Sequence, residues 1–250
     1  MNIAIVFSPN WSKYVEVELF AIYKNSTVPT KVYLFSDYID DFQIQKFNCI
    51  AEYFNNNHEV IYINVQPIYE SKIKTSINVE SRYTKYTLYR LLFPYLINDD
   101  KVLYIDADAI VNNDVTDLYN SLTDDYLIVG VKDTYCPVHF SDTDAYVNGG
   151  VLVMNLKSIR ELDIHEKWIY EVNNVYHRFH DQDIINETCR GKVLALDFKY
   201  NVSLSTGLEI NAEDIVIMHY AGTKTENGWV NDLPFSELWD KWKKQYKGMT

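Results

Sequence analysis

The chain contains a series of short apolar runs, rich in β-branched and aromatic residues, that recur along its length. Runs of this size and composition predict buried strands, here at 3–7, 31–36, 60–65, 101–107, 126–131, 150–155, 193–197 and 215–220. Stretches between them have apolar residues at intervals of three and four, which predicts helices at 14–24, 41–54 and 82–97. Strands that alternate with helices indicate an α/β fold with a mainly parallel, mixed sheet flanked by helices.

The length of 250 residues, with 47% hydrophobic side chains, allows one large domain or two small ones. Neither an internal repeat nor a Pro/Gly-rich linker divides the chain, so we expect a single domain over residues 1–250. A helical segment is expected at about 235–247. Its tryptophans and lysines would suit peripheral contact with a membrane, but a terminal helix that packs its tryptophans on the domain is favoured.

Charge and cysteine usage exclude several classes of function. The net charge of -12, without any long basic block, argues against a nucleic-acid binder. Cys49, Cys136 and Cys189 have no CxxC or zinc-ligand spacing, which favours free thiols in a reducing compartment. No apolar stretch approaches the roughly 18 residues of a membrane span, and the first residues lack the pattern of a signal peptide. We therefore expect a cytoplasmic protein.

Two carboxylates, Asp106 and Asp108, interrupt the apolar run VLYIDADAIV. In an extended segment residues two apart point the same way, so both charges would lie on one face at the end of the strand. Ligands of parallel α/β sheets bind at the carboxyl ends of strands, and carboxylate oxygens there suit Mg²⁺ or Mn²⁺. Such an ion could stabilise a diphosphate leaving group. The alternative for this motif alone is one Asp that caps a turn and one that is solvated.

Three further stretches bear on that choice. Paired glycines in YVNGGVLVMNL (146–156) allow a ligand to approach the backbone, although Asn-Gly is also a common turn. The acids of HDQDIINE (180–187) lie before an apolar step, as at the start of a helix. In IMHYAGTKTENGW (217–229), His219 follows a strand and could complete a metal site or be a buried polar residue with ordinary partners.

In chain order these pieces resemble family 8 glycosyltransferases, the group that includes glycogenin and the bacterial lipooligosaccharide galactosyltransferases. The resemblance runs from IAIVFSPNW through YRLLFPYLINDDKVLYIDADAIVNNDVTDLYN, NGGVLVMNL and DQDIIN to HYAGTK, and so reaches about residue 230. It implies a GT-A fold in which a divalent cation, usually Mn²⁺ with Mg²⁺ also possible, holds a UDP-sugar. It also implies transfer of a hexose, glucose or galactose, to a saccharide or glycoconjugate acceptor with retention of anomeric configuration.

Residue by residue, the resemblance makes Asp106, Asp108 and His219 the metal ligands, a set that suits Mn²⁺ better than Mg²⁺. Arg90 matches the arginine that approaches the metal carboxylates and the donor sugar. Asp181 and Gln182 match the pair that hydrogen-bonds the transferred sugar and lies beneath its anomeric carbon. The residues matched to donor binding are Ser8, Asn10, Trp11, Asp106, Ala107, Asn148, Gly149, Gly222 and Lys224.

The chain departs from the family at two places. The acidic residues that the family usually has near the N-terminus are replaced by Ser8 and Pro9. Asn10 would still hydrogen-bond the uracil edge, and Trp11 would provide the stacking face. Strict selection of uracil is left open. Near the C-terminus Lys224 comes one place early and lacks the following proline. It would then reach the diphosphate from a remodelled loop.

Retention can follow from two displacements or from attack on the face that the leaving group vacates. The amide of Gln182 is a poor nucleophile, which favours the second route. Two other functions stay open at this point. One is a phosphatase of the haloacid-dehalogenase type, although such enzymes usually have Thr or Val where this chain has Ile110. The other is a nucleotide-sugar binding module without turnover.

Overall fold

The computed structural model describes residues 1–54, 57–74, 78–79, 84–135, 145–221, 224–225, 228–229 and 234–249. Seven strands form one sheet in the order β3-β2-β1-β4-β7-β6-β8. Their bounds are β1 Asn2–Val6, β2 Lys31–Ser36, β3 Glu59–Asn64, β4 Lys101–Asp106, β6 Ile128–Lys132, β7 Val147–Asn155 and β8 Val193–Leu196. Strand β7 is antiparallel to β4 and β6, and all other pairings are parallel. The predicted α/β fold with a mainly parallel, mixed sheet is confirmed.

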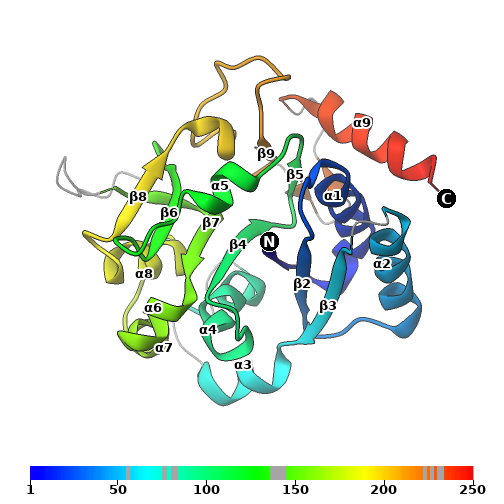
Figure 1. Ribbon diagram of the computed structural model, residues 1–250. Coiled ribbons are helices and arrows are strands. Elements are labelled where there is room, and N and C mark those ends of the chain that lie inside the picture. Colours follow the sequence, from blue (N-terminus) through cyan, green and yellow to red (C-terminus); the bar gives the residue numbers. More distant parts are fainter. Residues whose placement is uncertain are drawn as a thin grey trace.

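Helices cover both faces of the sheet (Figure 1). Ile3 and Ile5 of β1 pack into one apolar core with α1, α2 and α9, whereas Ala4 and Val6 pack into a second core with η2, α6, α7 and α8. This alternation follows from the two-residue period of a strand. The α-helices are α1 Ser12–Asn25, α2 Asp41–Tyr53, α3 Gln66–Lys72, α4 Phe93–Leu96, α5 Thr116–Asn120, α6 Leu156–Glu161, α7 Ile164–Asn174, α8 Asp181–Thr188 and α9 Ser236–Lys247, and the 3-10 helices are η1 Pro9–Trp11, η2 Lys85–Leu92 and η3 Phe198–Tyr200.

The predicted helix at 82–97 is wrong in type. Its residues 82–83 lie outside the described part, Lys85–Leu92 is the 3-10 helix η2, and only Phe93–Leu96 is α-helical. Pro94 lies in the first turn of α4, where its missing N–H removes no helical hydrogen bond, and the carbonyl of Arg90 accepts instead from the N–H of Phe93, as in a 3-10 helix.

The apolar run around the two aspartates is also not one strand. Strand β4 ends at Asp106, a turn follows at residues 107–108, and β5 (Ala109–Val111) then pairs with β9 (Ile217–His219) in a separate two-stranded sheet. The prediction of one extended segment is therefore wrong, although both carboxylates still lie on the same side, next to His219. The turn diverts the chain from the main sheet so that β5 can pair with a strand more than 100 residues later in the sequence.

The C-terminal helix α9 packs against α1 and buries Trp239 and Trp242. Both side chains belong to the core shared with α1 and α2. Within the described ranges, every helix is too short or too polar to cross a membrane.

Candidate active site

A pocket of about 190 Å³ opens at the carboxyl ends of β1 and β4. These parallel strands end side by side, since Val6 pairs with Asp106 in the sheet register. The chain that leaves β1 forms η1, and η2 forms another part of the wall. The lining residues are Val6, Phe7, Ser8, Trp11, Thr84, Tyr86, Thr87, Arg90, Tyr104, Asp106, Ala107 and Asp108.

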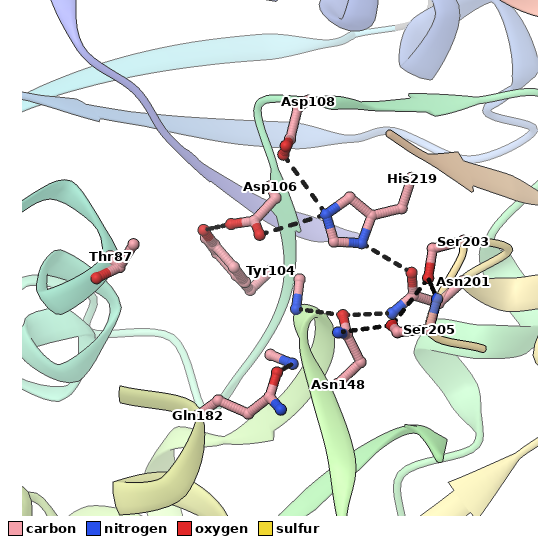
Figure 2. A network of polar contacts seen from close by, with 12 residues as sticks. Thr87, Tyr104, Asp106, Asp108, Asn148, Gln182, Asn201, Ser203, Ser205 and His219 are labelled. Carbon is pink, nitrogen blue, oxygen red and sulfur yellow. Dashed lines mark hydrogen bonds and ion pairs between the residues drawn. The ribbon is translucent and has the colours of Figure 1, made fainter. Parts of the chain in front are cut away.

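Asp106, Asp108 and His219 meet at one side of this pocket (Figure 2). Nε2 of His219 lies 3.5 Å from Oδ2 of Asp106 and 3.5 Å from Oδ1 of Asp108. The β5–β9 ladder produces this meeting, because Ala109 pairs with His219 and the Tyr220 N–H donates to the Asp108 carbonyl at 2.8 Å. Two carboxylate oxygens and one imidazole nitrogen within 4.8 Å of one another form a donor set that fits a divalent cation.

The two oxygens of Asp106 have different surroundings. Oδ1 accepts hydrogen bonds from Nη2 of Arg90, at 2.9 Å, and from the hydroxyl of Tyr104. Oδ2 faces His219. The protein thus holds one oxygen of the carboxylate and directs the other toward the candidate metal position.

Arg90 of η2 connects this cluster to the next group of polar residues. Its Nε lies 3.0 Å from Oδ2 of Asp181, its Nη1 donates to the carbonyl of Gly149, and its guanidinium lies 4.3 Å from the centre of the Tyr104 ring. Burial by itself would lower the pKa of Arg90, but the charges of Asp106 and Asp181 outweigh burial and raise it. Arg90 is therefore a permanent cation between two carboxylates.

Gln182, in the first turn of α8, lies on the far side of Arg90. Its Oε1 accepts from the N–H of Gly149 at 2.8 Å, and its Nε2 donates to Oδ2 of Asp133 and to the Tyr146 hydroxyl, each at 3.1 Å. Asn148 of β7 also donates to Oδ2 of Asp133, at 3.1 Å. The matched residues Asn148, Gly149 and Gln182 are thus brought together around one carboxylate.

Several residues of this arrangement were missed by sequence reasoning. Asp133 directly follows β6, so the rule that ligands lie at the carboxyl ends of strands could have found it. Asn201 donates through Nδ2 to Oδ1 of Asn148 at 3.0 Å, and no sequence pattern marked it. The missed lining residues of the pocket are Val6, Phe7, Thr84, Tyr86, Thr87 and Tyr104.

Glu18 of α1 is a further unexpected acid near the metal side. Its side chain is fully buried, and neither carboxyl oxygen has a hydrogen-bond partner among the described residues. Burial, reinforced by the charges of Asp108 and Asp106, raises the pKa of Glu18 well above its usual value. Glu18 therefore keeps its proton to a higher pH than an exposed glutamate does.

Other residues matched by resemblance differ in their placement. Ser8, Trp11 and Ala107 line the pocket, whereas Asn10 is exposed and is not a lining residue. Gly222 lies outside the described residues. Lys224 begins β10 (Lys224–Thr225), which pairs with β11 (Gly228–Trp229), and the structure describes only the backbone of this hairpin.

Comparison with known proteins gives consistent matches. The sequence profile described as Glycosyl transferase family 8 matches residues 2–229. A Haemophilus influenzae protein whose name marks it as an inferred glycosyltransferase is 29% identical over 243 residues, covering 89% of this chain and 71% of its own length. The lipopolysaccharide 1,2-glucosyltransferase of Escherichia coli K12 is 24% identical over 253 residues, covering 92% of this chain and 73% of its own. The chain superposes on the crystal structure of the galactosyltransferase LgtC with donor and acceptor sugar analogues, with a TM-score of 0.75 and 19% identity. The match covers 100% of this chain and 96% of that one, so the two have the same fold.

Proposed function

The chain belongs to glycosyl transferase family 8, and from this premise we propose that it transfers a hexose, glucose or galactose, from a UDP-sugar to a saccharide or glycoconjugate acceptor. The proposed enzyme is a single GT-A domain that depends on a divalent ion and retains the anomeric configuration. Membership of the family favours this function over the phosphatase alternative.

The observation that carries the proposal is the cluster of Asp106, Asp108 and His219 beside the pocket. Asp108 is 2% exposed and His219 is 3% exposed, whereas the side chain of Asp106, which also pairs with Arg90, is 24% exposed at the pocket. Two carboxylates that share one imidazole are costly to bury unless a cation balances them. The mixed oxygen and nitrogen ligands support Mn²⁺, with Mg²⁺ as a weaker candidate.

The pocket supports binding of the nucleotide end of the donor. Trp11 offers an aromatic face to the cavity, and stacking on such a face is a common way to bind a base. Ser8 lies nearby with a hydroxyl that both donates and accepts hydrogen bonds. Since Asn10 is exposed, we assign reading of the base edge to Ser8 and the η2 side chains rather than to Asn10.

The chemistry proposed for this site is a transfer between oxygen atoms. When bound, a divalent ion stabilises the negative charge that develops on the departing diphosphate. Arg90 holds Asp106 and Asp181 in place and adds positive charge beside the sugar. The Gln182 amide, fixed by Gly149 and Asp133, is a poor nucleophile. We therefore favour attack of the acceptor hydroxyl on the face that the leaving group vacates, with its proton passing to the departing phosphate oxygen.

The test is release of UDP from a panel of UDP-sugars, with and without acceptor sugars. The expected result is release from UDP-glucose or UDP-galactose that requires Mn²⁺ and stops with EDTA, and an α-linked product by NMR when the donor is α-linked. Full activity in EDTA would contradict the metal assignment. Binding of UDP by calorimetry without turnover of any donor would instead support a binding module, and hydrolysis of an aryl phosphate would support the phosphatase.

A further inference from the structure

A chain of hydrogen-bonded side chains leads from Asp133 to the candidate metal ligand His219. Figure 2 shows its part from Asn148 through Asn201 to His219. Asn148 donates to Asp133 at 3.1 Å, Asn201 donates to Asn148 at 3.0 Å, and Nδ1 of His219 lies 3.0 Å from Oδ1 of Asn201. Asn201 is completely buried, and Asn148 and His219 are nearly so. These contacts join segments of β7, β9 and the loop after η3, none of which are neighbours in the sequence.

The orientation of the Asn148 amide is fixed by two neighbours, one of which can only donate a hydrogen bond and the other only accept one. The backbone N–H of Gly150 donates to Oδ1 of Asn148 at 2.9 Å, and the carboxylate of Asp133 accepts from Nδ2 of Asn148. If the Asn148 amide were turned over, its NH₂ would face the Gly150 N–H and its oxygen would face the carboxylate. Both contacts would then be repulsive, so the amide has one orientation.

That orientation determines the next two links. Oδ1 of Asn148 requires a donor, so Nδ2 of Asn201 faces it and Oδ1 of Asn201 faces the imidazole of His219. An amide oxygen only accepts hydrogen bonds, so Nδ1 of His219 must carry the proton. In the neutral imidazole the lone pair is then on Nε2, which is the nitrogen that lies 3.5 Å from each of the Asp106 and Asp108 oxygens.

Close packing fixes the plane of the imidazole as well. A Cβ placed on Gly150 would lie 2.1 Å from Cε1 of His219, so a side chain at this position would push the ring away. The second glycine of the NGG sequence therefore makes room for the metal ligand, whereas the first, Gly149, contributes its backbone to Arg90 and Gln182.

We propose that Asn201 is a positioning residue of the metal site, which holds His219 in the tautomer that presents Nε2 to the ion. Asn148 orients Asn201, and Asp133 orients both Asn148 and Gln182, so one carboxylate aligns the sugar side and the metal side of the site. This inference rests on the proposed metal at Asp106, Asp108 and His219. It adds to that function a residue that neither the metal motif nor the sugar-binding motif contains.

The test measures Mn²⁺ affinity without donor or acceptor, by EPR of the free ion. Asn201→Ala is expected to weaken binding by about 10- to 100-fold, the usual effect of removing the partner of a metal-bound histidine. Asn78→Ala is the matched control, because Asn78 is also completely buried and makes side-chain bonds with the backbone of Val172, Val175 and His177. It should weaken folding while leaving the affinity for Mn²⁺ unchanged.

A second measurement uses the parent protein and so does not depend on folding of a variant. With ¹⁵N-labelled histidine and the diamagnetic ion Cd²⁺, the His219 signal, identified by its loss in His219→Gln, should show a proton on Nδ1 and coordination through Nε2. A proton on Nε2 would overturn the proposal, as would parent-like Mn²⁺ affinity in Asn201→Ala. A parent that binds no divalent ion would instead defeat the proposed metal site, and this inference with it.

Discussion

Two groups of acidic side chains lie at the candidate site and differ in how their charge is balanced. On one side Asp181 is paired with Arg90, with side chains 6% and 4% exposed. On the other side Asp106 and Asp108 share the imidazole of His219, and Glu18 lies buried nearby. The guanidinium of Arg90 pairs with Asp181 on the first side and with one oxygen of Asp106 on the second. The second side thus shares this cation while also holding Asp108 and Glu18.

Arg90 marks the boundary between the two groups, because it also bonds to one oxygen of Asp106. That bond leaves the other oxygen of Asp106 directed toward His219. This difference in charge balance shows that burial of an acid does not by itself define a metal site. A buried acid with an internal partner is part of the framework, whereas acids that exceed the local positive charge are arranged for an ion from outside.

The largest effect expected on the metal side is loss of turnover in Asp108→Asn. Removal of one ligand should lower activity at least about a thousandfold, since a metal supplies several kcal/mol of charge stabilisation in the transition state. The metal-free variant should melt at the same or a slightly higher temperature than the parent, because repulsion between the two acids is relieved. Steady-state kinetics and thermal melting measure the two quantities.

The melting experiment is repeated with Mn²⁺ and UDP. The ligands should raise the melting temperature of the parent by mass action and shift Asp108→Asn little. A variant that melts lower without ligand but keeps the full ligand-induced shift would show that Asp108 is structural, and the contrast between the two acidic groups would be wrong.

Arg90→Met should lower stability as well as turnover, because Arg90 pairs with both Asp181 and Asp106. The substitution leaves Asp181 buried without its cation, and breaking a buried ion pair destabilises by about 3 kcal/mol or more. Urea unfolding measures this free energy, and Arg178→Met, at an exposed position, is the matched control. Equal unfolding free energies for Arg90→Met and the parent would remove the distinction between framework and metal-binding acids.

A smaller effect is expected for the part of the pocket that carries little charge. Trp11→Ala should weaken UDP binding by about 2 kcal/mol, within the usual range for stacking of a base on an aromatic side chain. Calorimetry measures the affinity, with Tyr170→Ala, an exposed aromatic position, as the control. Unchanged affinity would assign Trp11 to packing against Tyr14, whose ring centre is 4.6 Å away.

The smallest effect, counted per pH unit, concerns Glu18 and its dependence on pH. The raised pKa means that, as pH increases above the usual value of 4.5, the unfolded chain loses this proton while the folded protein keeps it. Stability of the parent should therefore fall relative to Glu18→Gln, by at most about 1.4 kcal/mol per pH unit, up to the raised pKa. Urea unfolding across a pH series measures the difference. If the difference in unfolding free energy between the parent and Glu18→Gln stays constant above pH 4.5, the pKa of Glu18 is not raised by folding.

Several features of this protein follow from the sequence alone. The strand runs, their alternation with α1 and α2, and the order of the motifs predict the fold class and the family, both of which are confirmed. Residue types and places at the ends of strands made Asp106, Asp108 and His219 candidates, the family resemblance made them metal ligands, and the structure brings them together. Their role as ligands stays a prediction. Such features are readable because periodicity and polar interruptions are local properties of the chain.

The tertiary structure decided the rest. The side chains of η2 have the apolar spacing of an α-helix, yet the segment is a 3-10 helix with five buried side chains, Leu88–Leu92. The pairing of β5 with β9 joins segments about 100 residues apart, and the partners of Asn201 come from two further segments. The sequence pattern did not indicate that Glu18 is buried. The periodicity of a helix is the same whether one of its polar positions faces water or packs against protein. The tautomer of His219 and the balance of charge at each acid depend on which groups lie within a few ångströms, and only long-range folding brings those groups into contact.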